Sequence, residues 1–328
     1  MSSKDNPSPP FRGRGGAQAE GLGGEGLAES RVQTLTLPLR GPLPLPRKVP
    51  PARKAGEWIR SGLATAAQRL APHSEAPRLD AELLMAHALG ISREDLLLRH
   101  LDDPAPAAFA PFLARREAGE PVAYITGRRA FWTIDLEVGP GVLVPRPDSE
   151  SLIEAAVSHF RDSGPKRILD LGTGPGTLLL AALDQWPGAT GLGIDASERA
   201  LDYARRNADR LGLADRVDLR SGDWADGLEE RFDLVLCNPP YVEAGADLPR
   251  DVADWEPPEA LFAAADGLSE YRRIAPAMPR LLAPGGVACV ELGAGQLEAA
   301  AALFAAQGFT LSSRKDLKGV ERCLLLSR

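Results

Sequence analysis

Asn238, Pro239, Pro240 and Tyr241 directly follow an apolar run, residues 232–237, that predicts a buried strand. A planar NH2 group carries two N–H donors, so a site that holds one needs two acceptors in its plane. The Asn238 side-chain carbonyl and the Pro239 main-chain carbonyl can supply them. The two prolines stiffen the loop, and the Tyr241 ring offers a flat face for stacking. The same residues could form an ordinary strand-ending turn, because Asn-Pro often begins one.

A glycine-rich segment lies upstream, between an apolar strand-like run and the apolar residues 178–183. Strand, glycine turn and helix together are the context that a nucleotide-binding turn requires. Glycines let the backbone approach a ligand closely, and we expect Pro175 to set the first helical turn. Such a turn can also serve only to end a strand, without binding a ligand. The segment contains Asp170, Gly172, Thr173, Gly174, Pro175 and Gly176.

Two further strand-like segments end near carboxylates. The first, residues 190–195, ends in Asp195, about 20 residues after the glycine turn, where a carboxylate can accept bonds from ribose hydroxyls. The second, residues 217–221, is followed by Asp223 and Trp224. This pair would suit adenine, with Asp223 accepting from the exocyclic amine and Trp224 covering the ring. Alternatively, Asp223 caps a helix and Trp224 belongs to the core.

The glycine spacing separates this chain from nicotinamide dehydrogenases, which share the same beginning. Here the glycines follow Gly172-x-Gly174-x-Gly176, whereas a dinucleotide site has G-x-G-x-x-G. A glycine loop, a strand with Asp195, a strand with Asp223 and Trp224, and a strand with the Asn-Pro-Pro-Tyr loop follow one another along the chain. That order is typical of S-adenosylmethionine methyltransferases.

Several longer segments resemble the HemK/PrmC-type peptide chain release factor glutamine methyltransferases. The similarity covers roughly residues 55–328 in one register, with two mild departures: Pro175 replaces a small polar residue, and Ser149 stands where Thr is commoner. The segments that carry the resemblance are residues 121–127, 131–132, 142–150, 256–261, 267–274, 284–286, 291–296 and 316–322.

This resemblance implies a fold, a reaction and a set of site residues. The fold is α/β, a Rossmann-like seven-stranded methyltransferase domain whose last strand is antiparallel, preceded by a small helical domain and a β-hairpin linker. The reaction moves a methyl group from S-adenosylmethionine to the glutamine amide of the Gly-Gly-Gln motif in class 1 release factors, giving N5-methylglutamine. Asn238, Pro239 and Tyr241 would be catalytic, and Pro240 would join them in binding substrate. The cofactor would contact Asp170, Gly172, Thr173, Gly174, Pro175, Gly176, Asp195, Asp223, Trp224 and Asn238.

Other activities share parts of this pattern. An N6-adenine nucleic-acid methyltransferase also acts on a planar NH2 group, but it needs a way to grip a base, usually a basic recognition region. A ribosomal-protein glutamine methyltransferase is a sister enzyme, but residues 145–150 match the release-factor branch. A non-catalytic binding module is disfavoured because Asn238, Tyr241, Asp195 and the glycine loop are intact.

Composition and net charge limit the partners and the cellular location that we expect for this protein. The net charge of −7 argues against a stable nucleic-acid partner. No apolar run reaches the ~18 residues of a membrane span, and we expect neither a membrane partner nor export. The three cysteines lie in apolar runs and the four histidines form no cluster, so we expect no metal and a reducing cytoplasm. We expect a monomer.

The chain divides into four expected parts. Residues 1–52 are rich in proline and glycine and predict a disordered extension. Residues 53–122 show helical periodicity and predict a substrate-recognition domain, with exposed residues such as Arg115 making the contact. Residues 123–147 predict a β-hairpin linker centred on Gly139-Pro140-Gly141. Residues 148–328 predict the methyltransferase domain.

Overall fold

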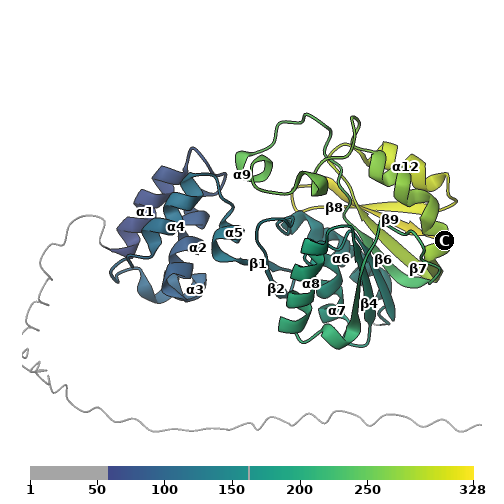
Figure 1. The fold of residues 1–328 in the computed structure, drawn as a ribbon, viewed down its shortest axis with the longest axis horizontal. Coiled ribbons are helices and arrows are strands. Elements are labelled where there is room, and N and C mark those ends of the chain that lie inside the picture. The colour runs from purple at the N-terminus through teal and green to yellow at the C-terminus, as the bar shows by residue number, and fades with distance from the viewer. Residues whose placement is uncertain (1–57, 162) are drawn as a thin grey trace, which may run out of the picture. The chain divides into compact units, whose positions relative to one another are not determined.

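A computed structural model describes residues 58–161 and 163–328 of the chain (Figure 1). The disordered extension expected over residues 1–52 therefore lies outside the described residues.

The first elements are helical, as the periodicity of residues 58–113 predicts. Ser92 caps one helix by accepting a hydrogen bond from the Asp95 amide, and Gly90 ends another in the left-handed region with φ of 68°. Apolar side chains such as Leu63, Leu84 and Leu113 form a separate small core. The elements are α1 (Ile59–Leu70), α2 (Pro77–Leu89), α3 (Arg93–Asp95), η1 (Leu96–His100), α4 (Phe109–Glu117) and α5 (Val122–Thr126).

A two-stranded antiparallel hairpin follows, built from β1 (Arg128–Phe131) and β2 (Ile134–Glu137). Its turn lies at Trp132, with φ of 54°, and Thr133, so the expected turn centre at residues 139–141 was wrong. The Trp132 amide and indole N–H donate to side chains of the next domain, and these tertiary bonds support the unusual backbone. Gly141 instead allows close packing, since a Cβ there would lie 2.5 Å from Arg199 Cδ.

The second domain contains a seven-stranded sheet in the order β5-β4-β3-β6-β7-β9-β8. All strand pairs are parallel except those of β9 with β7 and β8, which confirms the expected fold class. The chain order reverses between β3 and β6, and ligands of such sheets bind at the carboxyl ends beside this point. The strands are β3 (Arg167–Leu171), β4 (Thr190–Asp195), β5 (Val217–Ser221), β6 (Phe232–Cys237), β7 (Leu282–Glu291), β8 (Thr310–Lys315) and β9 (Glu321–Ser327).

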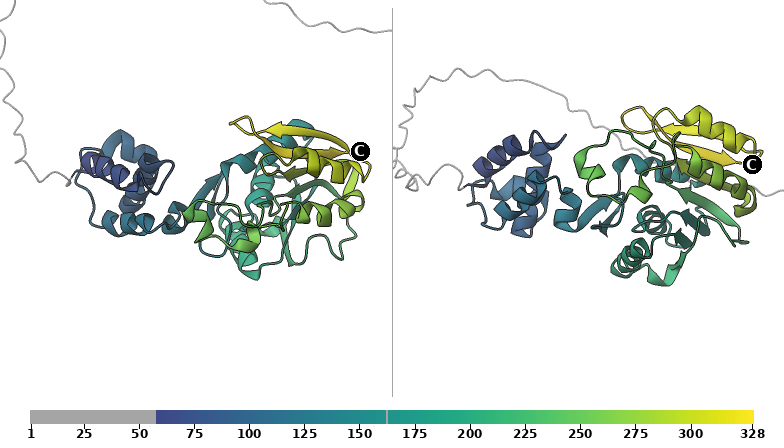
Figure 2. Two further views of the ribbon diagram at one scale, coloured as in Figure 1. Left: turned by 90° about the horizontal axis from the view of Figure 1, so that it is seen from above. Right: turned by 45° about the horizontal axis from the view of Figure 1, so that its top comes forward.

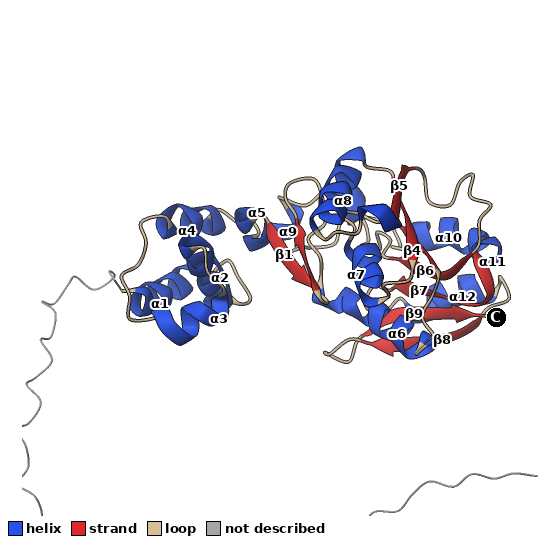
Figure 3. Ribbon diagram, turned by 90° about the horizontal axis from the view of Figure 1, so that it is seen from below, coloured by secondary structure: helices blue, strands red, loops and turns tan. Residues whose placement is uncertain are grey.

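Helices cover both faces of this sheet (Figures 2 and 3). On one face α6 (Glu150–Phe160), α7 (Thr177–Gln185) and α8 (Glu198–Arg210) pack on alternate strand residues such as Leu234. On the other face α10 (Ser269–Ile274), α11 (Met278–Leu281) and α12 (Leu297–Ala305) pack on the intervening residues, such as Val235. Burial on both faces explains why the inner strands β3 and β6 are mostly apolar, whereas the edge strands β5 and β8 carry polar residues.

The cysteines and the lengths of the helices bear on two further expectations. Cys237, Cys289 and Cys323 are free and buried, as expected of small core residues. In the part of the chain that the structure describes, no helix has the length and apolar character to cross a bilayer. The short elements are η2 (Pro147–Ser149), η3 (Ala214–Arg216), α9 (Arg250–Ala253), η4 (Pro258–Ala260) and η5 (Ala275–Ala277).

Candidate active site

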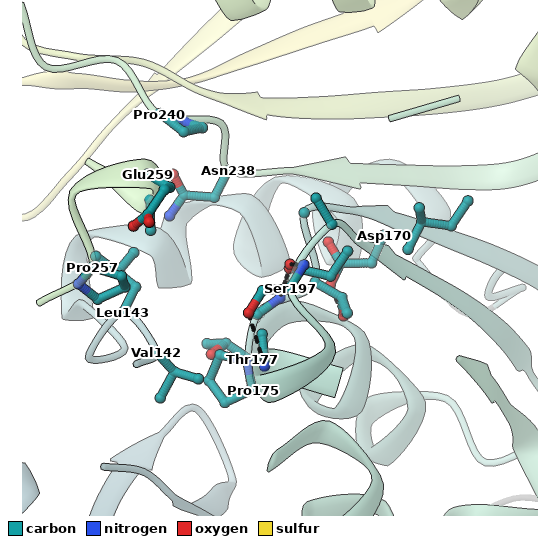
Figure 4. Close-up of a pocket in the computed structure, with 18 of the residues that line it drawn as sticks. Val142, Leu143, Asp170, Pro175, Thr177, Ser197, Asn238, Pro240, Pro257 and Glu259 are labelled. Carbon is teal, nitrogen blue, oxygen red and sulfur yellow. Dashed lines mark hydrogen bonds between the residues drawn. The ribbon is translucent and has the colours of Figure 1, made fainter. Parts of the chain in front are cut away.

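A cavity of about 720 Å³ opens at the carboxyl ends of the parallel strands. Segments that follow β3, β4, β5 and β6 line one part of it. The stretches 141–149 and 257–262, together with Glu270 and Arg273, line the rest (Figure 4). The cavity therefore collects every strand end that the sequence marked as a candidate site.

Asp170, at the end of β3, forms the floor of this cavity. Its Oδ2 atom accepts hydrogen bonds from Thr173 Oγ1 at 2.7 Å and from the Leu179 amide at 3.2 Å. Burial raises the pKa of the Asp170 carboxyl to about 7. Its other oxygen, Oδ1, is buried and has no hydrogen-bond partner among the residues described. Asp170 thus joins the glycine loop to the first turn of α7.

The three glycines of the loop have different tasks, although all have positive φ. Gly172 and Gly174 line the cavity, and a Cβ on Gly174 would meet nothing within 4 Å. Gly176 does not line it; a Cβ there would lie 2.7 Å from Leu180 Cδ1, so this glycine serves packing. Because Gly176 is the N-cap residue of α7, Pro175 precedes the helix and does not set its first turn as expected.

Asp195, at the end of β4, connects two backbone segments at the cavity wall. Its Oδ2 accepts from the Gly174 amide at 2.7 Å and its Oδ1 from the Ser197 amide at 2.8 Å. Burial raises the pKa of the Asp195 carboxyl. Each carboxylate oxygen keeps a further lone pair for a ligand, so the expected bond to ribose hydroxyls stays a prediction that this geometry permits.

Asp223 and Trp224 follow β5, and both line the cavity. Trp224 has φ of 50°, and its indole N–H donates to Glu270 Oε2 at 2.8 Å. A Cβ on Gly172 would lie 3.3 Å from the Trp224 ring, so the ring stands beside the glycine loop. The Asp223 side chain caps no described helix and forms an ion pair with Arg273. Its predicted bond to an adenine amine would therefore be shared with that arginine.

Asn238 and Pro240 line the cavity beyond the end of β6, whereas Pro239 is buried and is not among the lining residues. The Asn238 Nδ2 atom donates to Ser149 Oγ at 3.3 Å. Neither Asn238 Oδ1 nor the Pro239 carbonyl accepts a hydrogen bond from the described residues, but of the two only Asn238 lines the cavity.

Tyr241 lies outside the cavity lining. Its hydroxyl donates to Glu291 Oε1 at 3.1 Å, and burial raises the pKa of this phenol well above its ordinary value. The stacking of the Tyr241 ring on a flat substrate stays a prediction.

Several lining residues were not proposed from sequence. Most belong to the segments that carried the family resemblance, and their position in those segments was the available signal. In Figure 4 the side chains of Leu143, Pro257 and Glu259 gather on the Asn238 side of the cavity. The added residues include Leu143, Pro145, Arg146, Ser149, Thr177, Arg199, Pro257, Glu259, Phe262, Glu270 and Arg273.

A buried carboxylate, Glu256, connects the two segments that line this side. It accepts from the Val144 amide at 3.1 Å and from the Arg146 guanidinium at 2.6 Å. Burial raises the pKa of Glu256, while the Arg146 charge lowers it. Because Pro257 follows directly, this one side chain holds the 141–149 and 257–262 segments together.

The lining fits a cationic nucleoside such as S-adenosylmethionine. The glycine loop offers a backbone without side chains, and Asp195 offers a pair of hydrogen-bond acceptors. Trp224 offers an aromatic ring. The titratable side chains of the lining are acidic in excess, which favours a positively charged ligand. They comprise Asp170, Asp195, Asp223, Glu259 and Glu270 against Arg146, Arg199 and Arg273.

Comparisons with known proteins decide the family. Residues 62–127 match the PrmC N-terminal domain, and residues 162–315 match a methyltransferase domain. A release factor glutamine methyltransferase of Rhodospirillum rubrum is 46% identical over 260 residues, which cover 77% of this chain and 80% of the relative. The chain belongs to the release factor glutamine methyltransferase family.

Two further members of this family support the assignment over similar lengths. The release factor glutamine methyltransferase of Caulobacter vibrioides is 42% identical, covering 76% of this chain and 89% of the relative. The release factor glutamine methyltransferase of Cereibacter sphaeroides is 44% identical, covering 76% of this chain and 90% of the relative. The resemblance inferred from motifs is thus confirmed, as is the class of enzyme, and S-adenosylmethionine is the methyl donor of such a methyltransferase domain.

Proposed function

We propose that this protein methylates the side-chain amide nitrogen of the glutamine in the Gly-Gly-Gln motif of class 1 peptide chain release factors. The product is N5-methylglutamine, and the enzyme acts as a monomer in the cytoplasm, where translation takes place. The observation that carries the proposal is the placement of Asn238, with its Oδ1 free, in the same cavity as the glycine loop and Asp195. The names of the family members supply the class of substrate.

The chemistry demands orientation more than a base. A carboxamide nitrogen is a poor nucleophile because its lone pair is delocalised into the carbonyl. S-adenosylmethionine supplies an activated methyl group when it is bound. The protein must then align the nitrogen with that methyl group and keep water away.

Asn238 and Pro239 would perform this alignment. Two acceptors in one plane hold both N–H bonds of the amide, and they stabilise the positive charge that develops on nitrogen during attack. The methylated amide cation loses a proton readily, so no histidine or glutamate is needed as a base beside these two residues. Asp170, Asp195 and Asp223 are assigned to holding the cofactor.

Recognition of the protein substrate is proposed for the helical domain, residues 53–122. Glycines carry no side chains, so a Gly-Gly-Gln loop offers little besides the glutamine for selection. A second contact surface is therefore required. Arg115, which we expected to contact the substrate, is bound by Glu120 through two hydrogen bonds of 2.7 and 2.5 Å. It remains partly exposed and would present a charge that is already paired.

The decisive experiment offers competing substrates to the purified enzyme. A class 1 release factor, a ribosomal protein mixture, rRNA and duplex DNA are incubated with S-adenosylmethionine carrying a labelled methyl group. We expect label only in the release factor, with mass spectrometry locating one added methyl group on the glutamine of Gly-Gly-Gln. A release factor with that glutamine replaced by alanine is the matched control. Label in the DNA, in rRNA or in a ribosomal protein alone would reject the proposal.

A further inference from the structure

A buried polar network lies directly behind Asn238. Ser149, at the end of η2, is 2% exposed, and Glu291, the last residue of β7, is 1% exposed. Ser149 Oγ accepts the hydrogen bond from Asn238 Nδ2, and Glu291 Oε1 accepts the one from the Tyr241 hydroxyl. Both ends of the Asn-Pro-Pro-Tyr loop are thereby bonded to buried side chains on other elements.

The donor and acceptor positions of the Ser149 hydroxyl indicate a link to Glu291. A serine hydroxyl has one donor and two acceptor positions. Because Ser149 accepts from Asn238, its own proton needs a separate acceptor. Glu291 supplies a carboxylate whose Oε2 is buried and has no hydrogen-bond partner in the described part of the chain. Burial raises the pKa of Glu291 to about 7, although the Ser149 and Tyr241 hydroxyls favour the charged form.

Burying the Glu291 carboxylate reduces the stability of the fold, so its presence at this position indicates a functional role. A buried carboxylate without a close cation destabilises a fold, and an apolar side chain of similar size would avoid that cost. The nearby charges do not neutralise it by direct contact. Arg322 of β9 has ion pairs with Asp316 and Asp148, and it acts on Glu291 only from a distance.

The orientation of the Asn238 amide decides whether the site can hold its substrate. If Asn238 turned its NH2 group into the cavity, two NH2 groups would face each other and the substrate would lose one of its acceptors. The bond to Ser149 Oγ places the NH2 group against the protein, which leaves Oδ1 for the substrate.

We propose that Ser149 and Glu291 are positioning residues for methyl transfer. Ser149 fixes the direction of the Asn238 amide, and Glu291 orients the Ser149 hydroxyl while holding Tyr241 at the other end of the loop. Ser149 lines the cavity, but its proposed role, like that of Glu291, is exerted through Asn238 and Tyr241. The inference rests on the proposed role of Asn238 and adds to it the two residues that make that role possible.

The test compares four variants of the full-length enzyme with intact release factor as substrate. Ser149→Ala removes the acceptor, Ser149→Thr keeps a hydroxyl, and Glu291→Gln keeps the shape of Glu291 but removes its charge. Ser151→Ala is the matched control, because Ser151 is also buried but donates to the Asp148 carbonyl and does not line the cavity. For each variant kcat, KM, the Kd for S-adenosylmethionine and the melting temperature are measured.

We expect Ser149→Ala to lower kcat at least tenfold while the Kd for S-adenosylmethionine changes less than twofold. Ser149→Thr should restore kcat to within threefold of the wild type, and Glu291→Gln should lower kcat at least fivefold. Ser151→Ala should keep the wild-type kcat. If Ser149→Ala does not fold, Ser149→Cys provides the same comparison, because a thiol keeps the volume and bonds only weakly.

Two results overturn different claims. A wild-type enzyme that leaves the Gly-Gly-Gln glutamine unmethylated rejects the proposed function, and this inference with it. If the wild type methylates that glutamine and Ser149→Ala turns over equally fast, the positioning role alone is rejected. Equal losses of kcat in Ser149→Ala and Ser151→Ala would likewise assign the effect to the stability of the segment.

Discussion

The Gly174 amide donates to Asp195 Oδ2 at 2.7 Å, so the carboxylate at the end of β4 shapes the glycine loop that follows β3. The second oxygen of Asp195 holds the Ser197 amide at the start of α8. A residue expected only to contact the cofactor thus also supports the backbone on two sides of the cavity.

Because Asp195 has this double role, substitution by Ala and by Asn should weaken cofactor binding to different extents. Asp195→Ala should weaken S-adenosylmethionine binding by about 1.5–3 kcal/mol, through a lost charge-assisted bond and a loosened loop. Asp195→Asn keeps one acceptor and should lose less. Calorimetric titration measures both, with Asp215→Ala in exposed η3 as a control that should bind normally. Unchanged affinity in both Asp195 variants would remove this residue from the cofactor site.

Trp224 offers a second test of the cofactor site. Its ring stands beside Gly172, and its N–H donates to Glu270. Trp224→Ala removes both interactions and should weaken S-adenosylmethionine binding about tenfold, roughly 1.4 kcal/mol. Trp224→Phe keeps an aromatic ring and should recover most of that affinity. Calorimetry on the pair separates ring contact from hydrogen bonding; equal weakening in both would assign the role to the indole N–H.

Asn238→Ala addresses the chemical step. Loss of one oriented acceptor in a desolvated site should cost about 3 kcal/mol or more of transition-state stabilisation, roughly a hundredfold in kcat. Affinity for S-adenosylmethionine should stay nearly unchanged, because the glycine loop and Asp195 are untouched. Single-turnover methylation together with calorimetry gives both quantities. Near-normal turnover would show that the target amide binds elsewhere.

The buried acids Asp170 and Glu291 predict a pH dependence of stability. Burial raises both pKa values to about 7, from ordinary values of 3.8 and 4.5. Between those values the folded protein holds protons that the unfolded chain has released. The stability from these two groups is therefore complete at low pH and is lost as pH rises to about 7, by up to about 1.4 kcal/mol per pH unit for each group.

Urea unfolding of the wild type and Glu291→Gln at several pH values isolates one of these groups. The difference between the two free energies of unfolding should change between pH 4.5 and pH 7 and stay constant above it. Arg322, Asp148 and Tyr241 face Glu291 and are present in both proteins, so their effects largely cancel. A difference that does not vary with pH would mean that Glu291 is ionised throughout.

Recognition by a second surface predicts that kcat/KM differs greatly between a short peptide and an intact protein substrate. A free Gly-Gly-Gln peptide should be methylated with a far lower kcat/KM than an intact release factor. Removing residues 1–50 should change neither value. Removing the helical domain should raise KM for the protein substrate and spare cofactor binding. Steady-state kinetics on both substrates checks these points, and equal efficiency on peptide and protein would limit the helical domain to a stabilising role.

The strand-end residues could be predicted from sequence because each is local. Asn238, Asp195 and the glycines follow apolar runs directly, and parallel strands bring their carboxyl ends to one edge. The bond from Asn238 to Ser149 could not be predicted in this way, since it joins residues that are distant in sequence. The hairpin turn was misplaced for a similar reason. Trp132 adopts a positive φ through contacts with later elements, whereas the expected Gly139 and Gly141 serve packing.

The Glu256 carboxylate has a consequence for how tightly a substrate can bind. It holds two segments of the cavity rim in place before any ligand arrives, through the Val144 amide and the Arg146 guanidinium. The conformational entropy of those segments is therefore lost during folding and does not reduce the affinity for substrate. A glutamine on a flexible, glycine-flanked loop must lose its own freedom on binding, so a rim ordered in advance limits that loss to one of the two partners.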